Sequence, residues 1–324
     1  MILSRSFRER TPFPGQDPFV VPHDGAFLLI QAARNDRRIV IKRFAELGEM
    51  HRNTQTTIWK PLRGSRRGRQ LWAPELHEID GRWYVYYAAS DGQNENHRMY
   101  VLEADRPLGP YHSLGQIGDP HHDTWAIDMT VLRHDGRLYA VWSGWEGEHD
   151  GFPQHLYIAP MADPATISGE RVRISSPELD WEQRVAPLNE GPQVLRNERD
   201  GKLFIAFSAD ASWSPEYKVG LLEWTGGPLL DSASWTKRPE PLLTGGGHGC
   251  FIEADGRHWF VYHRKLSADP GWADREIRVE PFTWDADGYP VLESQRRTVD
   301  LTAGPESPAE GLPVSGFASA SGLG

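Results

Sequence analysis

The sequence predicts an all-β fold, a five-bladed β-propeller with four antiparallel strands in each blade. The first observation is an Asp-Gly pair followed closely by an aromatic or aliphatic run, which occurs five times. The second observation is their regular spacing. The pairs begin at Asp24, Asp80, Asp135, Asp200 and Asp255, so neighbouring pairs are 55 to 65 residues apart. The third observation is the content of 25 Pro and 32 Gly, which disfavours long helices.

Each Asp-Gly pair predicts a tight β-hairpin, because the turn needs positive φ, which Gly and Asp tolerate. A third strand-like run follows each hairpin, at residues 39–41, 99–102, 156–158, 219–222 and 277–279. A weaker fourth run is present in some units, as at 57–59 and 234–236. Five repeats of about four strands favour a radial arrangement of sheets. A two-domain β-sandwich is the alternative, but it explains the hairpins without explaining their period.

The propeller is expected to span residues 13–302, after an N-terminal segment at 1–12. Residues 303–324 are rich in Gly, Ala, Ser and Pro, and this composition is typical of a flexible tail or a linker.

Composition excludes several classes of protein. The net charge of −10 argues against a nucleic-acid partner, which would need a basic surface. The single cysteine, Cys250, rules out an internal disulfide and a thiolate zinc cage. No run approaches the ~18 apolar residues of a membrane span, and the N-terminus lacks the apolar core of a secretion signal. The chain as written is expected to be cytoplasmic, or secreted if a signal has been removed, and its oligomeric state stays open.

The first strand of each propeller blade lines the central axis, so its entry residue points toward the mouth of the channel. Alignment on the apolar pair before each turn makes Asp17, Ala73, Asp128, Gly191 and His248 the entry residues. Asp17, Asp128 and His248 each precede their turn Asp by seven residues, and Glu190 stands one position ahead of this register. Three carboxylates and a histidine are therefore expected to converge at one mouth.

Crowded carboxylates raise one another's pKa, and separated pKa values let one site hold both an acid and a base. Glycoside hydrolysis uses such a pair, ~6.5–9.5 Å apart in inverting enzymes and ~5–5.5 Å apart in retaining ones. Units one and four are not neighbours in a five-membered ring, so Asp17 and Glu190 should face each other at the wider spacing. Asp17 is then the general base and Glu190 the general acid. Asp128, beside Glu190, would keep that acid protonated.

Further candidates surround these residues. Trp72 and Trp125 adjoin entry positions and would either stack on a sugar or pack between blades. His248 would bond backbone or water, or help to hold an ion. A loop with Asp119, His121 and His122 precedes Asp128; it would touch substrate, chelate a metal or simply be exposed. Glu75 is expected to bond neighbouring backbone.

The set of motifs resembles glycoside hydrolase family 43 over roughly residues 13–292. The motifs are Asp17-Pro18, Trp-Ala-Pro-Glu at 72–75, Ile127-Asp128, Glu190-Gly191-Pro192 and Gly247-His248-Gly249. The resemblance implies a five-bladed propeller and an enzyme that is an α-L-arabinofuranosidase, a β-xylosidase or an endo-arabinanase, most of them inverting.

The same resemblance implies site residues. The family's base, pKa modulator and acid match Asp17, Asp128 and Glu190. Its axial histidine, often beside calcium or another ion, matches His248, and its sugar-binding arginine matches Arg275. Met129 stands where many relatives have Pro, which should change the strand entry slightly and leave the role of Asp128 intact.

We therefore expect an exo-acting α-L-arabinofuranosidase that cleaves arabinan or arabinoxylan oligosaccharides without an organic cofactor. A β-xylosidase or endo-arabinanase on the same scaffold is the alternative within the family. A retaining relative acting on fructans or other furanosides, and a non-catalytic glycan-binding propeller, are the alternatives outside that reading.

Overall fold

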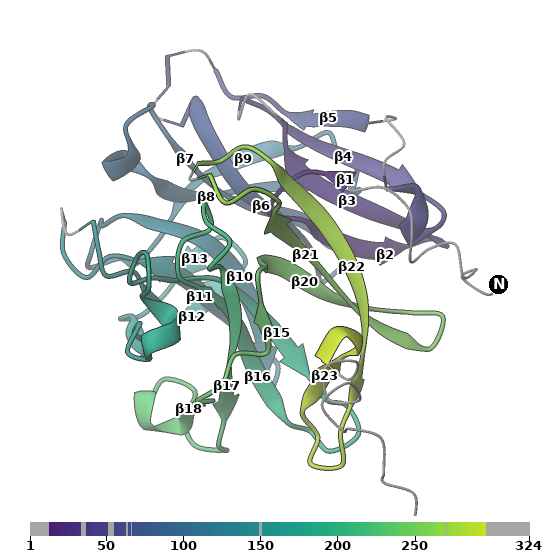
Figure 1. The fold of residues 1–324 in the computed structure, drawn as a ribbon. Coiled ribbons are helices and arrows are strands. Elements are labelled where there is room, and N and C mark those ends of the chain that lie inside the picture. Colours follow the sequence, from purple (N-terminus) through teal and green to yellow (C-terminus); the bar gives the residue numbers. More distant parts are fainter. Residues whose placement is uncertain are drawn as a thin grey trace, which may run out of the picture.

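The protein is described by a computed structural model covering residues 13–33, 37–50, 55–62, 64–65, 67–148, 151–269 and 271–295. Five small antiparallel sheets stand in a ring, which confirms the predicted five-bladed propeller (Figure 1). The expected N-terminal segment 1–12 and the tail 303–324 lie outside the described residues.

The blades follow one another along the chain. Blade one holds β2 (Phe19–His23), β3 (Ala26–Ala32), β4 (Ile39–Phe44) and β5 (Gln55–Trp59); blade two holds β6 (Arg69–Ile79), β7 (Arg82–Ser90), β8 (Arg98–Ala104) and β9 (His112–Ile117); blade three holds β10 (Ala126–His134), β11 (Arg137–Gly144), β12 (His155–Asp163), β13 (Thr166–Ile167) and β14 (Val172–Ser175); blade four holds β15 (Asn189–Arg196), β16 (Leu203–Ala209), β17 (Lys218–Trp224), β18 (Trp235–Lys237) and β19 (Leu243–Thr244); blade five holds β20 (Gly247–Ala254), β21 (Arg257–Lys265), β22 (Arg275–Trp284), β23 (Pro290–Leu292) and β1 (Phe13–Pro14). Every predicted third strand and both predicted fourth strands lie within these elements or, for Ser234, at the edge of one.

Blade five closes the ring with both ends of the described chain. Its fourth position is shared by β1, where Phe13 lies opposite Ile277, and β23, where Leu292 lies opposite Phe282. The sequence does not predict this closure, because the two-residue β1 carries no pattern of its own.

Four of the five Asp-Gly pairs form the predicted two-residue hairpin turns. In the first, φ is 47° at Asp24 and 68° at Gly25, and the turns at 80–81, 135–136 and 255–256 are alike. The fourth hairpin differs, because Arg196 pairs with Leu203 across a six-residue loop. Only Gly201 of its Asp-Gly pair has positive φ.

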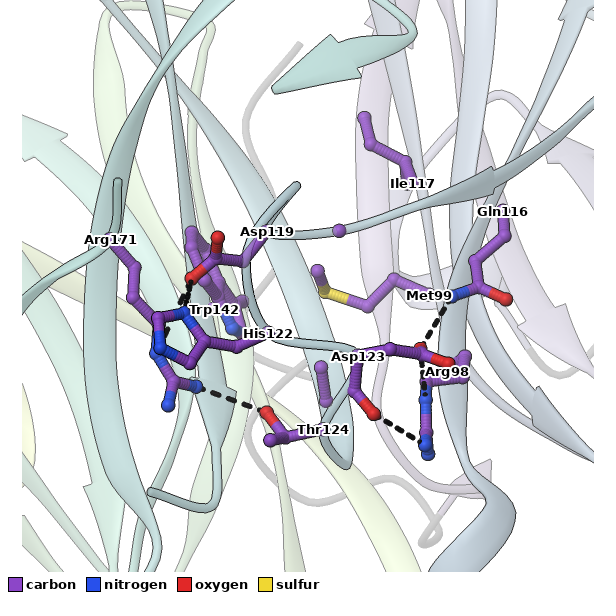
Figure 2. A pocket seen from close by; sticks show the side chains of 12 residues that line it. Arg98, Met99, Gln116, Ile117, Asp119, His122, Asp123, Thr124, Trp142 and Arg171 are labelled. Atoms are coloured by element: carbon purple, nitrogen blue, oxygen red, sulfur yellow. Dashed lines mark hydrogen bonds and ion pairs between the residues drawn. The ribbon is translucent and has the colours of Figure 1, made fainter. Parts of the chain in front are cut away.

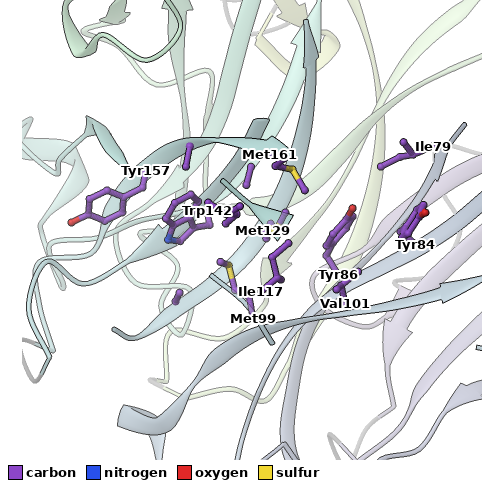
Figure 3. Close-up of a cluster of buried hydrophobic side chains, with 14 residues drawn as sticks. Ile79, Tyr84, Tyr86, Met99, Val101, Ile117, Met129, Trp142, Tyr157 and Met161 are labelled. Carbon is purple, nitrogen blue, oxygen red and sulfur yellow. The ribbon is translucent and has the colours of Figure 1, made fainter. Parts of the chain in front are cut away.

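Apolar side chains fill the spaces between blades. Figure 3 shows one such cluster, in which Tyr86, Met99 and Ile117 of blade two meet Met129 and Trp142 of blade three. All five are buried, and burying an aromatic or aliphatic side chain of this size contributes roughly 1.5–3 kcal/mol. Each blade therefore needs a neighbour on both faces, which a closed ring provides.

Three-residue 3₁₀ helices lie at Leu47–Glu49, Asn94–Asn96, Asp180–Glu182 and Ser232–Ser234, and residues 293–295 are helical at the end of the described chain. Among the residues described, no helix is long and apolar enough to cross a membrane.

Candidate active site

The entry residues of the five blades share an unusual backbone conformation. The angle φ is 46° at Asp17, 42° at Ala73, 58° at Asp128, 53° at Gly191 and 42° at His248. In blades two to five, a register shift in the ladder between the first two strands accompanies this residue. Positive φ costs a non-glycine residue of order 1–3 kcal/mol, and such strain collects at functional sites. The five positions equated by the sequence alignment are thus structurally equivalent.

Asp17 lies among basic side chains. Its Oδ1 is 3.3 Å from Nδ1 of His263, 3.6 Å from Nδ1 of His248 and 3.8 Å from Nη1 of Arg275. Burial alone would raise the pKa of Asp17, but His248 and the Arg275 guanidinium outweigh burial and lower it. Asp17 is therefore an ionised carboxylate at neutral pH, as a general base must be.

Asp128 meets the same histidine from blade three. Its Oδ2 accepts the N–H of Gly191 at 3.1 Å and lies 3.8 Å from Nδ1 of His248. Burial, followed by the negative charge of Asp17, raises the pKa of Asp128 well above its usual value.

Glu190 is buried at the start of β15. Its Oε1 accepts a 2.7 Å hydrogen bond from the hydroxyl of Tyr217. Burial first, and then the charge of Asp128, raises the pKa of Glu190 to about 7. Near neutral pH a large fraction of Glu190 carries a proton, while Asp17 does not.

The crowding at Gly191 accounts for the position of Glu190 one residue ahead of the register. A Cβ added to Gly191 would lie 3.0 Å from Cγ of His248, so a side chain at this entry position would press on the His248 ring. Blade four therefore presents its carboxylate from Glu190, the residue before.

His248 and Arg275 both lie beside the carboxylates, where the sequence placed them. The N–H of His248 donates to Oγ of Ser208 at 2.7 Å. Arg275 donates to the side chain of Gln16 and, at 3.3 Å, to the carbonyl of Trp272. The structure thus brings Asp17, Asp128, Glu190, His248 and Arg275 into one cluster.

The two tryptophans have different surroundings. Trp125 is 1% exposed, stacks on Trp145 with 4.8 Å between ring centroids, and donates from Nε1 to the carbonyl of Asn94. No ring face of Trp125 is free for a sugar, and the packing role fits it. Trp72 is half-buried, with His97 stacked 3.8 Å away on the ring.

The loop before Asp128 uses its polar groups internally. A cavity of about 200 Å³ lies between blades two and three. Figure 2 shows Asp119, His122 and Arg171 among the side chains that line it. The Asp119 carboxylate accepts the N–H of His121 at 2.8 Å and is paired with His122 at 2.8 Å and Arg171 at 3.5 Å. These contacts hold the loop together and explain its shape without a ligand.

Glu75 lies deeper in the channel and bonds side chains, whereas backbone partners were expected. Its carboxylate accepts from the amide of Gln193 and pairs with His77 at 2.8 Å. A register shift between Trp72 and Glu75 accompanies this placement, and Gln193 of blade four reaches the carboxylate of Glu75 across the channel.

A metal ion has little to hold it here. Within the described ranges, no group of three or more His, Cys, Asp and Glu side chains is arranged to bind one. A hard cation prefers six to eight oxygen ligands. The residues around His248 do not form such a set, so no step of the chemistry below passes through an ion.

Sequence reasoning missed Tyr217, His263 and Gln16. His263 follows the aromatic run of blade five and Gln16 precedes Asp17, but the repeat alone gives neither a role. Tyr217 belongs to a loop outside the repeat, so no periodic signal points to it.

Comparison with known proteins agrees with this geometry. The model of glycosyl hydrolases family 43 matches residues 11–290. An extracellular exo-alpha-(1->5)-L-arabinofuranosidase of Streptomyces chartreusis is 35% identical over 274 residues, covering 78% of this chain and 82% of that protein. Alpha-L-arabinofuranosidase 43 of Humicola insolens is 34% identical over 85% of this chain and 60% of its own length. The chain thus spans only about three-fifths of this longer relative.

Among solved structures, an alpha-L-arabinofuranosidase from Lactobacillus brevis superimposes with a TM-score of 0.78 at 34% identity. The match covers 85% of this chain and 93% of that one. More distant sequence relatives include a beta-xylosidase of Xylanibacter ruminicola, at 26% identity.

Proposed function

The chain belongs to glycosyl hydrolases family 43, and from this premise we propose that it is an inverting, exo-acting α-L-arabinofuranosidase. The proposed substrates are arabinan and arabinoxylan oligosaccharides. The observation that carries the proposal is the separation of two pKa values in one buried cluster. The pKa of Asp17 is lowered, while that of Glu190 is raised to about 7.

In the proposed reaction, Glu190 gives its proton to the glycosidic oxygen as the bond from that oxygen to the anomeric carbon breaks. Asp17 takes a proton from a water molecule, whose oxygen bonds the anomeric carbon from the opposite face. One attack from the opposite face inverts the anomeric configuration. Asp128 orients the sugar and, through its charge, favours the protonated form of Glu190.

Arg275 is proposed to hold the sugar in the first subsite, because its guanidinium lies 3.8 Å from Asp17. Trp72, half-buried near the same mouth, is the aromatic residue proposed to contact the sugar. The choice of arabinose over xylose rests on the names of the relatives at 34–36% identity.

The decisive experiment is a panel of aryl glycosides with NMR detection of the first product anomer. We expect hydrolysis of the α-L-arabinofuranoside with inversion. On arabino-oligosaccharides, whose leaving group needs a proton, Asp17→Asn and Glu190→Gln should each lose about 10²–10⁴-fold in kcat/KM. Preference for the β-xyloside would move the assignment to a β-xylosidase, and cleavage confined to internal bonds of arabinan to an endo-arabinanase. Retention of configuration would contradict the mechanism, and near-normal activity of either variant on arabino-oligosaccharides would contradict the residue roles.

The proposed partner is an oligosaccharide or polysaccharide. Three of the relatives are named as extracellular enzymes, which favours secretion over the cytoplasmic location expected from the sequence. Assay of the natural host's medium and cell extract would distinguish the two locations.

A further inference from the structure

Tyr217 contacts the proposed general acid directly. It is the last residue of the loop between β16 and β17 and is 2% exposed. Its hydroxyl donates a 2.7 Å hydrogen bond to Oε1 of Glu190. The mechanism proposed above gives this residue no task.

The ring of Tyr217 also contacts a histidine that is hydrogen-bonded to the proposed general base. It stacks on the ring of His263, with 5.5 Å between centroids and 24° between planes. Nδ1 of His263 accepts the N–H of Asp17 at 3.1 Å. Two stacked rings therefore join the acid of blade four to the base of blade one.

The backbone of Gly246 and Gly247 lies against this tyrosine. A Cβ on Gly247 would lie 2.6 Å from Cε1 of Tyr217, so a side chain at Gly247 would displace the ring. The carbonyl of Tyr217 accepts the N–H of Gly246 at 2.9 Å. These two contacts favour the placement of the Tyr217 hydroxyl beside Glu190.

We propose that Tyr217 is a positioning residue that keeps Oε1 of Glu190 as a hydrogen-bond acceptor and leaves Oε2 to carry the proton for the leaving group. The stack on His263 keeps that proton at a constant distance from Asp17. This inference rests on the proposed function, since it assumes that Glu190 is the general acid.

The chemistry of the phenol suits this task. Burial, and then the charge of Glu190, raises the pKa of Tyr217 well above 10, so its hydroxyl remains a donor throughout the working range. A hydrogen bond donated to a carboxylate favours the ionised form. Tyr217 accordingly lowers the pKa of Glu190 against the larger effect of burial and stabilises the anion left after proton transfer.

The test is the pH profile of Tyr217→Phe. In the wild type, kcat/KM should fall as pH rises through about 7, because Glu190 must be protonated to react. Loss of the hydrogen bond should move this alkaline limb to higher pH. It should also lower kcat by about tenfold to a hundredfold, the amount expected for a hydrogen bond to a charged group, with KM little changed.

The leaving group separates positioning from general damage. A nitrophenyl group departs with little protonation, whereas an arabinose unit of an oligosaccharide needs the acid. The loss in Tyr217→Phe should therefore be larger on arabino-oligosaccharides than on the nitrophenyl glycoside.

Tyr262→Phe is the matched control. Tyr262 is also a buried tyrosine that donates to a carboxylate, Oε2 of Glu280 at 3.2 Å, but its partner is not part of the catalytic cluster. The pH profile of kcat/KM in Tyr262→Phe should therefore match that of the wild type. If Tyr217→Phe fails to fold, 3-fluorotyrosine at position 217, a stronger donor, should move the alkaline limb to lower pH.

A wild-type alkaline limb and wild-type kcat in folded Tyr217→Phe, or in the fluorinated protein, would overturn the inference. If Glu190→Gln is inactive in the same assays, the proposed function survives that result. If the wild type hydrolyses no glycoside of the panel, the proposed function itself fails.

Discussion

The two ends of the central channel are built by the same five strands, β2, β6, β10, β15 and β20, yet they differ in chemistry. At one end, Asp17, Asp128 and Glu190 lie together with shifted pKa values. Toward the Asp-Gly turns, the same strands line a cavity of about 340 Å³. That cavity is larger than the one beside Asp119, so cavity size does not locate the chemistry in this molecule.

The carboxylates of the two regions are partnered differently. Glu75, deeper in the channel, has an amide and a histidine for its two oxygens. At the catalytic mouth the carboxylates face one another as well as a few donors. Burial would raise the pKa of Asp17, but His248 and Arg275 outweigh burial and lower it, whereas burial and the charge of Asp128 raise the pKa of Glu190. Positive φ does not distinguish the two regions, since it occurs at the entry residues of the mouth and also at Asp24, Asp80, Asp135 and Asp255 in the turns. The comparison teaches that a common scaffold acquires reactivity where like charges are left incompletely compensated.

The largest expected contrast is between Asp128→Asn and Glu75→Gln. Asp128→Asn removes the charge that helps to keep Glu190 protonated, and should lower kcat/KM by about 10²–10⁴-fold, the range for groups that govern proton transfer. Glu75→Gln changes a group that already has two partners, and should cost less than about tenfold. Steady-state kinetics on one arabino-oligosaccharide, whose leaving group needs the acid, would measure both. Equal losses would mean that the channel acts as one electrostatic unit.

Substitution of one glycine at each end of the central channel should give a smaller contrast in activity. Gly191→Ala places a Cβ 3.0 Å from the His248 ring at φ 53°, whereas Gly256→Ala, at φ 66° in a turn, meets nothing within 4 Å. Both variants should lose about 1–3 kcal/mol of stability from backbone strain. Only Gly191→Ala should also lose activity, because His248 must move. Thermal unfolding with kinetics would check this, and an inactive Gly256→Ala would contradict the division.

Cys250→Ser should have the smallest effect. Cys250 is 2% exposed on β20, where its Sγ accepts the N–H of Val20 at 3.1 Å. Serine keeps the acceptor but adds polarity at an apolar site, so we expect a loss of about 1 kcal/mol in the free energy of unfolding. Urea denaturation would measure it, and kcat/KM should be unchanged. A clear fall in kcat/KM would show that the channel wall is coupled to the mouth.

Much of the fold could be predicted, because its signals are local. The positive φ needed in a two-residue turn selects Asp-Gly, and this is why four of five turns were found in the expected form. The fourth pair was assigned to a hairpin correctly, although its loop is longer than a tight turn.

Only part of the candidate site could be predicted from local sequence signals. Alignment of the repeats located Asp17, Asp128 and His248, and the structure gives them one backbone conformation. Trp125 looked equally suitable for sugar binding, but stacking on Trp145 buries it. Adjacency in sequence does not determine which face of a ring another loop will cover.

The sequence by itself determined the number of blades, the register of their inner strands and the carboxylates that enter the channel. These follow from side-chain alternation and turn chemistry over a few residues. Only the tertiary structure decided that β1 completes the last blade, that Glu75 bonds other side chains, and that Tyr217 and His263 connect Glu190 to Asp17. The bond from Asp17 to His263 joins residues 246 positions apart. Contacts of that separation depend on closure of the whole ring, which no local pattern specifies.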